Sequence, residues 1–370
     1  MLFHTWPFAV FFLVVLAGFF ALSRTRFWVL WLLVASYVFY GWWNPYYLVL
    51  IFYSTALDYV IVACMDHCPQ SVRNGSTVDR FRGFFAGLTG GDGGTSPASV
   101  RVLRVAFSLF GVGAVASLGA AIVGQGSVRP LMGLLSVIFG LMAFGAMAQS
   151  RFAWLIVSLV NNLGILVFFK YANFFVENVN AVLAWLHLGV RVSDPALLMP
   201  FGLEYLLPVG ISFYTFQSMS YTIDFYQGKI HRERSFIRFA TFVSFFPQLV
   251  AGPIERSSNL LPQFNQFPKI RLRDVTDGMS LFLVGLFKKL ALANYLSFYV
   301  ERVYENPSAQ DASALMLGTF CFAWQIFFDF SGYTDMARGV AQTMGFRLML
   351  NFNNPYLATG LGDFWSRWHI

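Results

Sequence analysis

Residues 7–22 read PFAVFFLVVLAGFFAL, an apolar run that contains no charged side chain. Two similar runs follow at residues 27–43 and 45–65, and each approaches the roughly 20 residues that a helix needs to cross a bilayer. Apolar side chains fill these runs almost continuously, whereas a surface helix of a soluble protein has one apolar and one polar face. The sequence therefore predicts an all-α protein, a polytopic bundle of transmembrane helices.

The composition indicates the same class of protein. Of 370 residues, 57% are hydrophobic and only 12% are charged, whereas soluble domains carry about 25% charged residues. This leaves too little polar surface to cover a particle in water. The net charge of +7 comes from Lys and Arg residues that lie mostly in short connections, a placement typical of membrane proteins. Because these residues form no basic stripe with interleaved aromatic side chains, we expect no nucleic-acid partner.

Further spans are expected at residues 105–123, 131–148, 152–169, 279–300 and 314–333. Residues 66–104 are rich in Gly, Ser and Arg, so we expect a solvent-exposed loop with a short surface helix near residues 78–88. The spans at 105–123 and 131–148 contain almost no polar residue. We therefore expect them to form a helical hairpin that faces lipid.

The chain becomes less regular after Lys170. An apolar stretch at residues 174–188 contains Glu and Asn, and the stretches at 197–223 and 236–254 are interrupted by Pro and Gly. Such interruptions predict broken or re-entrant helices, which persist at membrane depth only where they line a cavity or are buried in protein. Residues 336–350 have the pattern of an amphipathic helix.

The positions of the arginines predict the orientation. Arg24 and Arg26 follow the first span, several arginines lie in the loop at 66–104, and Arg151 precedes the span at 152–169. Positively charged connections favour the cytoplasmic side. All three connections face the cytoplasm if the N-terminus lies outside.

Polar residues inside or beside apolar runs are costly and often functional. Here they concentrate in three stretches, residues 248–256, 327–335 and 363–369. We expect the following residues to line a cavity: Gln248, Glu255, Arg256, Gln325, Asp329, Ser331, Tyr333, Asp335, Asn351, Asp363 and Arg367. The alternative is that each is a helix cap, an ion-pair partner or an interfacial anchor.

His369 stands out among the five histidines. Trp365 and Trp368 flank it, and Asp363 lies six positions upstream. A neutral imidazole in such a setting can accept a proton from a hydroxyl nucleophile, although an interfacial histidine among tryptophans fits the spacing equally. Other common chemistries lack their motifs, including the P-loop, the dinucleotide fingerprint and the zincin helix. Cys64, His67 and Cys68 lack a fourth ligand at a suitable spacing, so we expect no metal site.

Several stretches together resemble one known family. They are PVGISFYTFQ at 208–217 with YTID at 221–224, residues 239–264 and 329–339, NFNNPYL at 351–357, and DFWSRWHI at 363–370. The chain resembles the membrane-bound O-acyltransferases, and within them the branch of alginate O-acetyltransferases and relatives that acetylate other exopolysaccharides or D-alanylate teichoic acid. The resemblance covers residues 1–65 and about 152 to the end. Residues 66–150 have no counterpart, so we expect an insertion in a single membrane domain of residues 1–370.

The resemblance implies an acyl donor on the cytoplasmic side, acetyl-CoA or an acyl carrier, and a carbohydrate hydroxyl outside, joined by a tunnel. It implies no bound cofactor, and periplasmic acyltransferases as partners at a bacterial inner membrane. His369 matches the histidine of the family's D-F-W-x-R-W-H motif, which lies in the tunnel. The family has a second histidine in a G-x-W-H-G type segment some tens of residues further on. We therefore expect the chain to be incomplete at its C-terminus.

These inferences predict an enzyme, an O-acyltransferase that acetylates an extracellular polysaccharide such as alginate. The alternative is a transporter or a non-catalytic membrane subunit of a polysaccharide export machine, since broken helices and polar residues at membrane depth suit that class as well. Transporters often show corresponding interruptions in two halves of the chain. Here the interruptions follow Leu197, and with the family motifs they favour the acyltransferase.

Overall fold

The computed structural model describes residues 1–68, 98–123, 128–148, 150–199, 204–250 and 252–370. Within these ranges the regular structure is helical and no strand is present. The helices that are long and apolar enough to cross a membrane are Pro45–Asp66, Val102–Ala121, Arg151–Trp185, Leu272–Glu305 and Ala312–Thr343. The prediction of an all-α polytopic membrane protein is confirmed.

The contacts divide the chain into two compact units, which are described separately. The first unit comprises residues 1–51 and 235–370, and the second comprises residues 52–234. The expected insertion at residues 66–150 lies wholly within the second unit, and neither end of it coincides with a boundary between the units.

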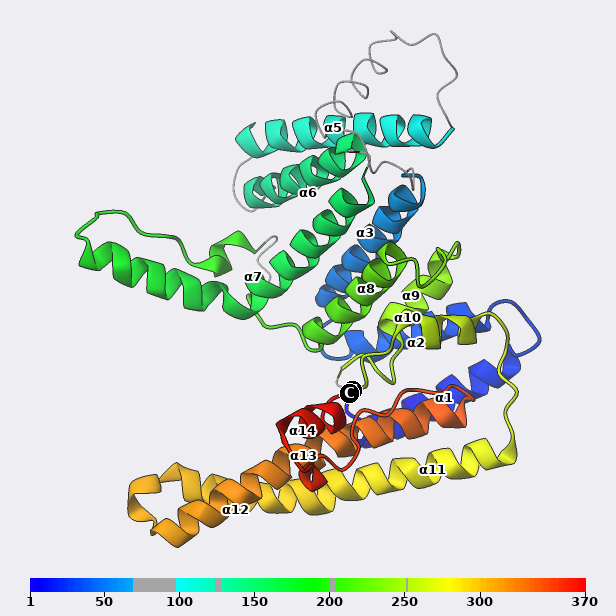
Figure 1. Ribbon diagram of the computed structural model, residues 1–370, viewed down its shortest axis with the longest axis vertical. Coiled ribbons are helices and arrows are strands. Elements are labelled where there is room, and N and C mark those ends of the chain that lie inside the picture. Colours follow the sequence, from blue (N-terminus) through cyan, green and yellow to red (C-terminus); the bar gives the residue numbers. More distant parts are fainter. Residues whose placement is uncertain (69–97, 124–127, 149, 200–203, 251) are drawn as a thin grey trace. The chain divides into compact units, whose positions relative to one another are not determined.

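The first unit is built from short and long helices (Figure 1). They are α1 (Trp6–Ala21), α2 (Trp28–Gly41), α9 (Phe236–Ser244), α10 (Ser257–Leu260), α11 (Leu272–Phe287), α12 (Asn294–Glu305), α13 (Ala312–Thr343) and α14 (Leu361–Arg367). A π-helix at Lys288–Ala293 joins α11 to α12, so residues 272–305 form one continuous helical rod. This rod packs against α13 along much of its length.

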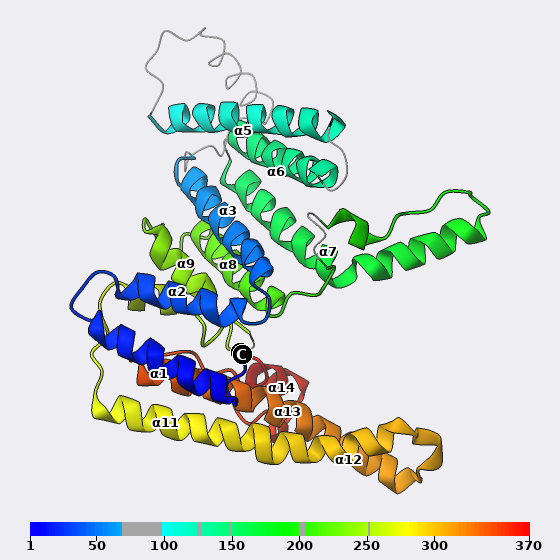
Figure 2. The ribbon, with the colours of Figure 1, turned by 180° about the vertical axis from the view of Figure 1, so that it is seen from behind.

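The helices of the second unit are α3 (Leu48–Asp66), which begins just before the boundary, α5 (Ala98–Val123), α6 (Val128–Ala148), α7 (Arg151–Trp185) and α8 (Ile211–Tyr226). Both ribbon views show α3, the first part of α7, and α8 side by side (Figure 1, Figure 2). Trp154 of α7 and Tyr214 and Tyr221 of α8 are buried. Gly210 precedes α8 with a φ of 72°, a left-handed conformation that glycine adopts without strain. The predicted break in the stretch at 197–223 is confirmed at this turn.

The predicted helical hairpin is confirmed in the second unit. α5 packs on α6, where the Ser136 hydroxyl donates to the carbonyl oxygen of Ala114 at 3.0 Å. α6 in turn packs on α7, with Gly145 against the Trp154 ring. α5 begins at Ala98, so its first residues belong to a helix and not to the predicted loop. The predicted surface helix at 78–88 lies outside the described residues.

Two predicted helix boundaries were wrong. α7 is one helix of 35 residues, where the sequence predicted a span at 152–169 and a separate stretch at 174–188. The polar residues around Lys170 do not end it, because only Pro and, to a lesser degree, Gly oppose a helix strongly. α13 likewise continues to Thr343 and includes the first half of the predicted amphipathic helix at 336–350. It ends just before Gly345, which has a φ of 83°.

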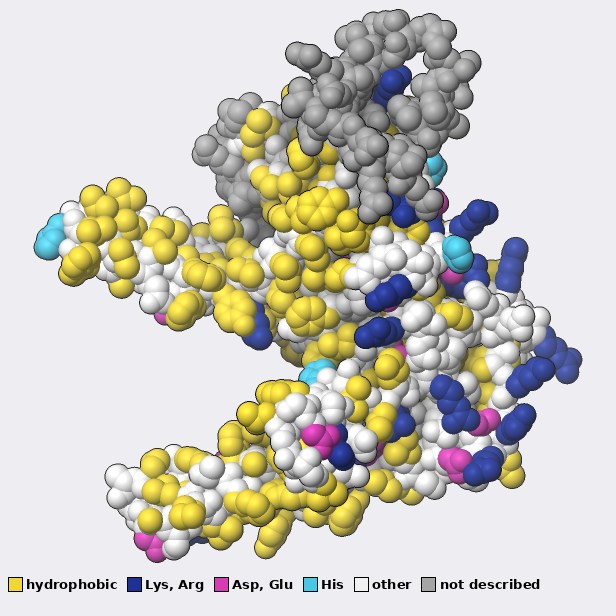
Figure 3. Space-filling view, in the orientation of Figure 1, with side chains coloured by type: hydrophobic (Ala, Val, Ile, Leu, Met, Phe, Trp, Pro, Cys, Tyr) yellow, Lys and Arg dark blue, Asp and Glu magenta, His cyan; other side chains and the backbone are white. Residues whose placement is uncertain are grey.

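Apolar side chains dominate the outer surfaces of the long helices. The space-filling view shows them along α7 in one unit and along α12 and α13 in the other (Figure 3). Phe174 is 61% exposed, Phe298 is 72% exposed and Met316 is 76% exposed. Large apolar surfaces are unusual on proteins in water. Lipid chains are the solvent that suits them.

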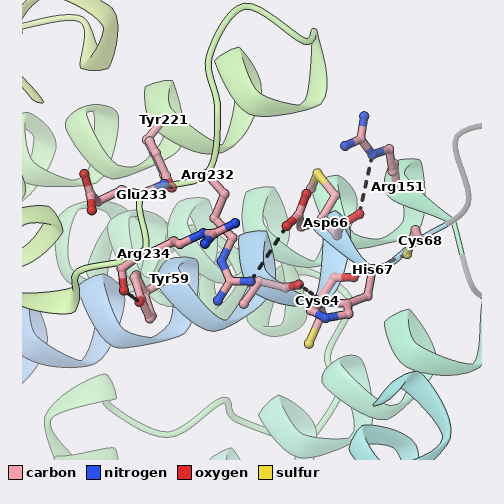
Figure 4. A network of polar contacts seen from close by, with 12 residues as sticks. Tyr59, Cys64, Asp66, His67, Cys68, Arg151, Tyr221, Arg232, Glu233 and Arg234 are labelled. Atoms are coloured by element: carbon pink, nitrogen blue, oxygen red, sulfur yellow. Dashed lines mark hydrogen bonds and ion pairs between the residues drawn. The ribbon is translucent and has the colours of Figure 1, made fainter. Parts of the chain in front are cut away.

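Polar contacts gather at the C-terminal end of α3 (Figure 4). Arg232 forms an ion pair with Asp66, at 3.8 Å between nitrogen and oxygen. The Arg151 guanidinium donates to the carbonyl oxygen of Met65 at 3.4 Å. These contacts place the start of α7 and the segment after α8 at the same end of the second unit, together with the end of α3.

Candidate active site

The polar residues of the first unit meet at the middle of α13. Asp329 and Asp335 lie there, and Lys288 and Lys289 face them from the π-helix between α11 and α12. The ammonium of Lys288 lies 2.7 Å from a carboxylate oxygen of Asp335, and Lys289 forms an ion pair with Asp329. Asp329 lies more than about 20 Å from each end of α13, at 1.5 Å per residue. The charges therefore lie near the centre of a span and satisfy one another there.

The π-helix explains how two consecutive lysines reach one neighbouring helix. In a regular α-helix, adjacent residues point about 100° apart. A π-helix turns the chain more slowly, and such segments are frequent at functional sites. Our sequence analysis did not single out Lys288 and Lys289. The sequence did carry a signal for them, because two charged residues inside the apolar span predicted at 279–300 are costly.

His4 joins this group from the N-terminal turn. Phe3 packs on Tyr333 of α13, with ring centroids 4.8 Å apart, and so holds the turn beside α13. Burial lowers the pKa of His4, the positive charge of Lys289 lowers it further, and the negative charge of Asp329 opposes both. His4 was not among the predicted site residues, because nothing in the local sequence links residue 4 to α13.

His369 is brought to the middle of α13 by the pairing of two backbone segments. The Ile370 amide donates to the carbonyl oxygen of Asn351, and the Asn353 amide donates to that of Arg367, both at 2.9 Å. The imidazole lies edge-on to Phe330, with ring centroids 5.0 Å apart. His369 has a φ of 50°, a left-handed conformation that is uncommon outside glycine.

The His369 ring is covered in part by aromatic side chains. It contacts Phe330 and also Phe352, whose ring centroid is 6.5 Å away. Trp368 packs on Phe352, whereas Trp365 is 66% exposed. Burial lowers the pKa of His369 below its usual value of 6.5. The imidazole is therefore mainly neutral at pH 7, the form that accepts a proton.

Two of the predicted cavity residues, Glu255 and Gln248, form hydrogen bonds that hold neighbouring backbone segments in place. Glu255 is fully buried, and its carboxylate accepts hydrogen bonds from the Met349 amide and from Asn259, the latter at 2.6 Å. Burial raises the pKa of Glu255. Gln248 donates to the carbonyl oxygen of Phe242 at 2.7 Å. These contacts hold the loop after α9 and the segment after α13 in place.

Three of the remaining predicted residues, Asp363, Arg367 and Asn351, form hydrogen bonds within the protein. Asp363 accepts from the guanidinium of Arg367 at 2.7 Å and from the Thr359 amide at 3.1 Å, which fixes the start of α14. These hydrogen bonds, with that from Arg367 the largest contributor, lower the pKa of Asp363. Asn351 donates to Thr334 at 3.2 Å.

Gln325 and Ser331 differ from these residues, because each has a polar atom that no described residue satisfies. Gln325 Oε1 and Ser331 Oγ are buried on α13 without a hydrogen-bond partner among the described residues. Tyr333 contacts Phe3, as described above, and Arg256 lies exposed at the start of α10.

The structure thus brings together some of the predicted residues. Three of them lie on α13, namely Asp329, Ser331 and Asp335. Two others contact this helix, His369 at Phe330 and Asn351 at Thr334. The described residues contain no group of three His, Cys, Asp or Glu side chains arranged to hold a metal ion.

The chain is similar to several known acyltransferases. It is 40% identical over 230 residues to a probable alginate O-acetylase of Pseudomonas syringae pv. tomato, a match that covers 62% of this chain and 42% of that protein. It is 35% identical over 246 residues to a peptidoglycan O-acetyltransferase of Helicobacter pylori, covering 59% of this chain and 44% of the other. The chain is a homologue of these enzymes.

A more distant match is a teichoic acid D-alanyltransferase of Bacillus subtilis, 28% identical over 166 residues and covering 44% of this chain and 42% of that protein. The resemblance to the membrane-bound O-acyltransferases is confirmed by these matches. No family model matches the chain. In each case the match spans less than half of the relative's length.

Proposed function

We propose that the chain forms part of a membrane-bound O-acyltransferase that acetylates hydroxyl groups of a polysaccharide outside the cell. Similarity to an alginate O-acetylase and a peptidoglycan O-acetyltransferase supports this proposal. The observation that carries it is the position of His369 against Phe330, at the middle of a membrane-spanning helix. A base at that depth can act on an acceptor that enters from one side and a donor that enters from the other.

In this mechanism His369 acts as the general base. Its neutral imidazole takes the proton from the acceptor hydroxyl as the hydroxyl oxygen attacks the acyl carbonyl carbon. The tetrahedral intermediate then collapses, so that an ester bond to the sugar remains and the carbon–sulfur bond of a thioester donor breaks. The proton passes from the imidazolium to the leaving thiolate. Holding both substrates in one dry path supplies proximity and limits hydrolysis of the donor.

The charged groups beside His369 have a role in the same proposal. Lys288 and Lys289 bring positive charge to the depth of the reaction, and positive charge favours the oxyanion that develops on the acyl carbonyl. Ser331 and Gln325 offer unpaired polar atoms to the substrates. That the other predicted residues line the substrate path stays a prediction.

The proposal places the protein in a bacterial inner membrane with its N-terminus outside. The donor, acetyl-CoA or a loaded acyl carrier, reaches the site from the cytoplasm. Periplasmic acyltransferases act with the enzyme on the acceptor polysaccharide. The similarity to O-acetylases supports the acetyl group, and the relative that transfers D-alanine makes that residue the second acyl group to test.

Replacing His369 in the full-length protein tests the proposal. We expect His369→Ala and His369→Gln to abolish acetyl transfer from radiolabelled donor to polysaccharide in membranes, while membrane insertion and protein level stay unchanged. His231→Ala is the matched control, because His231 is exposed in the second unit. Transfer by His369→Ala at close to the wild-type rate would show that His369 is not the base.

Bacterial strains that produce these His369 variants also distinguish an enzyme from a transporter or a non-catalytic export subunit. Loss of an acyltransferase leaves the polysaccharide exported at the normal amount but without acetyl groups. Loss of a transport subunit reduces the exported amount itself. Measuring total sugar and ester-linked acetate in the same culture medium separates the two functions.

A further inference from the structure

The second unit contains a buried carboxylate for which the proposed acyl transfer has no use. Asp58 lies on α3, inside a candidate membrane span, and none of its surface is exposed. Ser158 and Asn162 of α7 donate hydrogen bonds to it, the former at 2.6 Å and the latter to both carboxylate oxygens at 3.1 and 2.9 Å. Ser218 of α8 donates to the second oxygen. Three helices therefore converge on one carboxylate.

The charge of Asp58 has no protein counterpart in the described part of the chain. Asn162 donates to both carboxylate oxygens, an arrangement suited to an ionised group. No Lys, Arg or His forms an ion pair with Asp58 among the described residues. An ionised carboxylate without a partner is very costly in an apolar interior. The site therefore requires either a positive ion or a proton.

Three residues, on the same helices as Asp58 and its hydrogen-bond donors, carry a buried oxygen atom without a partner among the described residues. Thr55 lies three residues before Asp58 on α3, and Thr222 lies four residues after Ser218 on α8. Side chains three or four residues apart share one face of a helix. Both threonine side chains are fully buried, and neither hydroxyl has a hydrogen-bond partner among the described residues. The amide oxygen of Asn162 is also buried and unpaired.

Buried threonine hydroxyls in membrane helices normally bond to a carbonyl oxygen of the preceding turn. Thr241 and Ser244 illustrate such partners elsewhere in this chain. Three unpaired oxygens around one buried carboxylate are therefore costly unless something bridges them. A proton on Asp58 would neutralise the charge, but the single O–H that it creates could donate to at most one of the two threonine oxygens and the amide oxygen. A cation would satisfy the charge and the oxygens together.

We propose that Asp58 binds a monovalent cation, Na⁺, together with oxygens of its neighbours on three helices. The oxygen ligands are those of Thr55, Asp58, Ser158, Asn162, Ser218 and Thr222. One carboxylate and neutral oxygens balance a single positive charge, whereas a divalent ion would leave one charge uncompensated in the interior. Serine hydroxyls that donate to Asp58 keep lone pairs free for the ion. Oxygen atoms are the ligands that hard cations prefer.

The ion ties α3, α7 and α8 together. Asp58 lies about 12 Å from the end of α3 at 1.5 Å per residue. Because the site is closed to the surface, the ion enters when the helices separate locally. Its first consequence is therefore on the stability of the second unit, and it is independent of the proposed acyl transfer.

Thermal unfolding of the purified full-length protein in detergent tests the proposal. NaCl is titrated against choline chloride at constant ionic strength, after incubation long enough for the closed site to equilibrate. A ligand that binds only the folded state raises the melting temperature in a saturable way. We expect a rise of several degrees with Na⁺ and binding of one ²²Na⁺ per chain. Identical melting curves in Na⁺ and choline would overturn the proposal.

Variants identify the ligands. We expect Asp58→Asn to abolish the response to Na⁺, while Asp66→Asn, the same change at the end of the same helix, retains it. Thr55→Val and Thr222→Val keep the shape of the side chain and remove one oxygen, so each should raise the apparent Kd for Na⁺ at least tenfold. An unchanged Kd in both threonine variants would refute the ligand set, even if Asp58→Asn fails to fold. If Asp58 is instead a neutral acid, Asp58→Asn melts like the wild type and neither responds to Na⁺.

Discussion

Gly285 of α11 and Gly332 of α13 face each other with no room for a side chain on either. A Cβ atom on Gly285 would lie 2.5 Å from the carbonyl oxygen of Gly332, and one on Gly332 would lie 2.8 Å from that of Gly285. Gly278 and Gly339 approach each other in the same reciprocal way. The spacing of seven residues on both helices brings two backbone contacts onto one face. These contacts hold the π-helix lysines within reach of the carboxylates of α13.

We expect Gly285→Ala to destabilise the protein by about 1–3 kcal/mol, because the new methyl group meets backbone atoms that cannot move aside. The melting temperature in detergent measures the effect. Gly164→Ala on α7 is the matched control, since a Cβ atom there meets nothing within 4 Å. Equal melting temperatures for the two variants would show that α11 and α13 pack less closely than the structure indicates.

The ion pair between Lys288 and Asp335 should be stronger than that between Lys289 and Asp329. The Asp335 side chain is 14% exposed, whereas that of Asp329 is 50% exposed. Removing one partner of a covered pair leaves an uncompensated charge. We therefore expect Lys288→Met to cost at least about 2 kcal/mol of stability and Lys289→Met to cost less.

A double-mutant cycle tests this interpretation of the Lys288 pair. If the cost is that of an unpaired charge, Lys288→Met with Asp335→Asn should be more stable than either single variant. Arg338 also lies 3.5 Å from Asp335, so the loss on removing Lys288 stays partial. Additive effects of the two changes would mean that the pair does not interact energetically.

The spans and interruptions could be predicted from the sequence because each depends on local properties. Length and apolar content determine a span, and Pro or Gly at Pro208 and Gly210 determine a break. Helix ends were less certain, as in α7, because a lone Lys170 inside an apolar run does not stop a helix. The free-energy cost of placing Lys170 inside a helix depends on the residues around it in the folded protein, and the local sequence does not show these.

The candidate site was predicted in part. His369 was identified by its motif, and Asp329 and Asp335 by charge inside an apolar run. Lys288 and Lys289 carried the same signal, but their importance lies in partners 40 and 47 residues away. His4 carried no signal, because only the packing of Phe3 on Tyr333 brings it to α13. Glu255 was predicted to line a cavity, and its hydrogen bonds to Asn259 and Met349 could not be predicted because they depend on tertiary structure.

The buried Glu255 predicts a pH-dependent difference between the wild type and Glu255→Gln. Burial raises the pKa of Glu255 above 4.5 in the folded protein, and the hydrogen bond from Asn259 opposes this only in part. The folded state therefore holds the proton more tightly than the unfolded state. The wild type loses stability relative to Glu255→Gln as the pH rises from about 4.5 through the folded-state pKa. Melting temperatures of both proteins across this window measure the difference, and a constant difference would contradict the assignment.

The rate of acyl transfer should follow the protonation of His369. Because burial holds the pKa of His369 below 6.5, the imidazole is neutral between pH 7 and 8 and the rate should not change there. Below the pKa of His369, which lies under 6.5, the rate should fall towards tenfold for each pH unit, as the imidazolium accumulates. Initial rates with a saturating donor, at constant ionic strength, give the profile. A rate that still rises between pH 8 and 9 would assign the base to a group of higher pKa.

The orientation of the second unit can be tested at two of its exposed residues. The contacts of Figure 4 gather Arg151 and Arg232 at one end of α3, and the arginines of such an end favour the cytoplasm. Gly189 lies beyond the opposite end of α7, and His231 lies beside Arg232 after α8. In a background where the three cysteines are replaced by Ser, we expect an impermeant maleimide to label Gly189→Cys but not His231→Cys in intact cells. Both variants should be labelled after the membrane is opened, which shows that each thiol is accessible. Labelling of His231→Cys alone in intact cells would invert the assignment for the second unit.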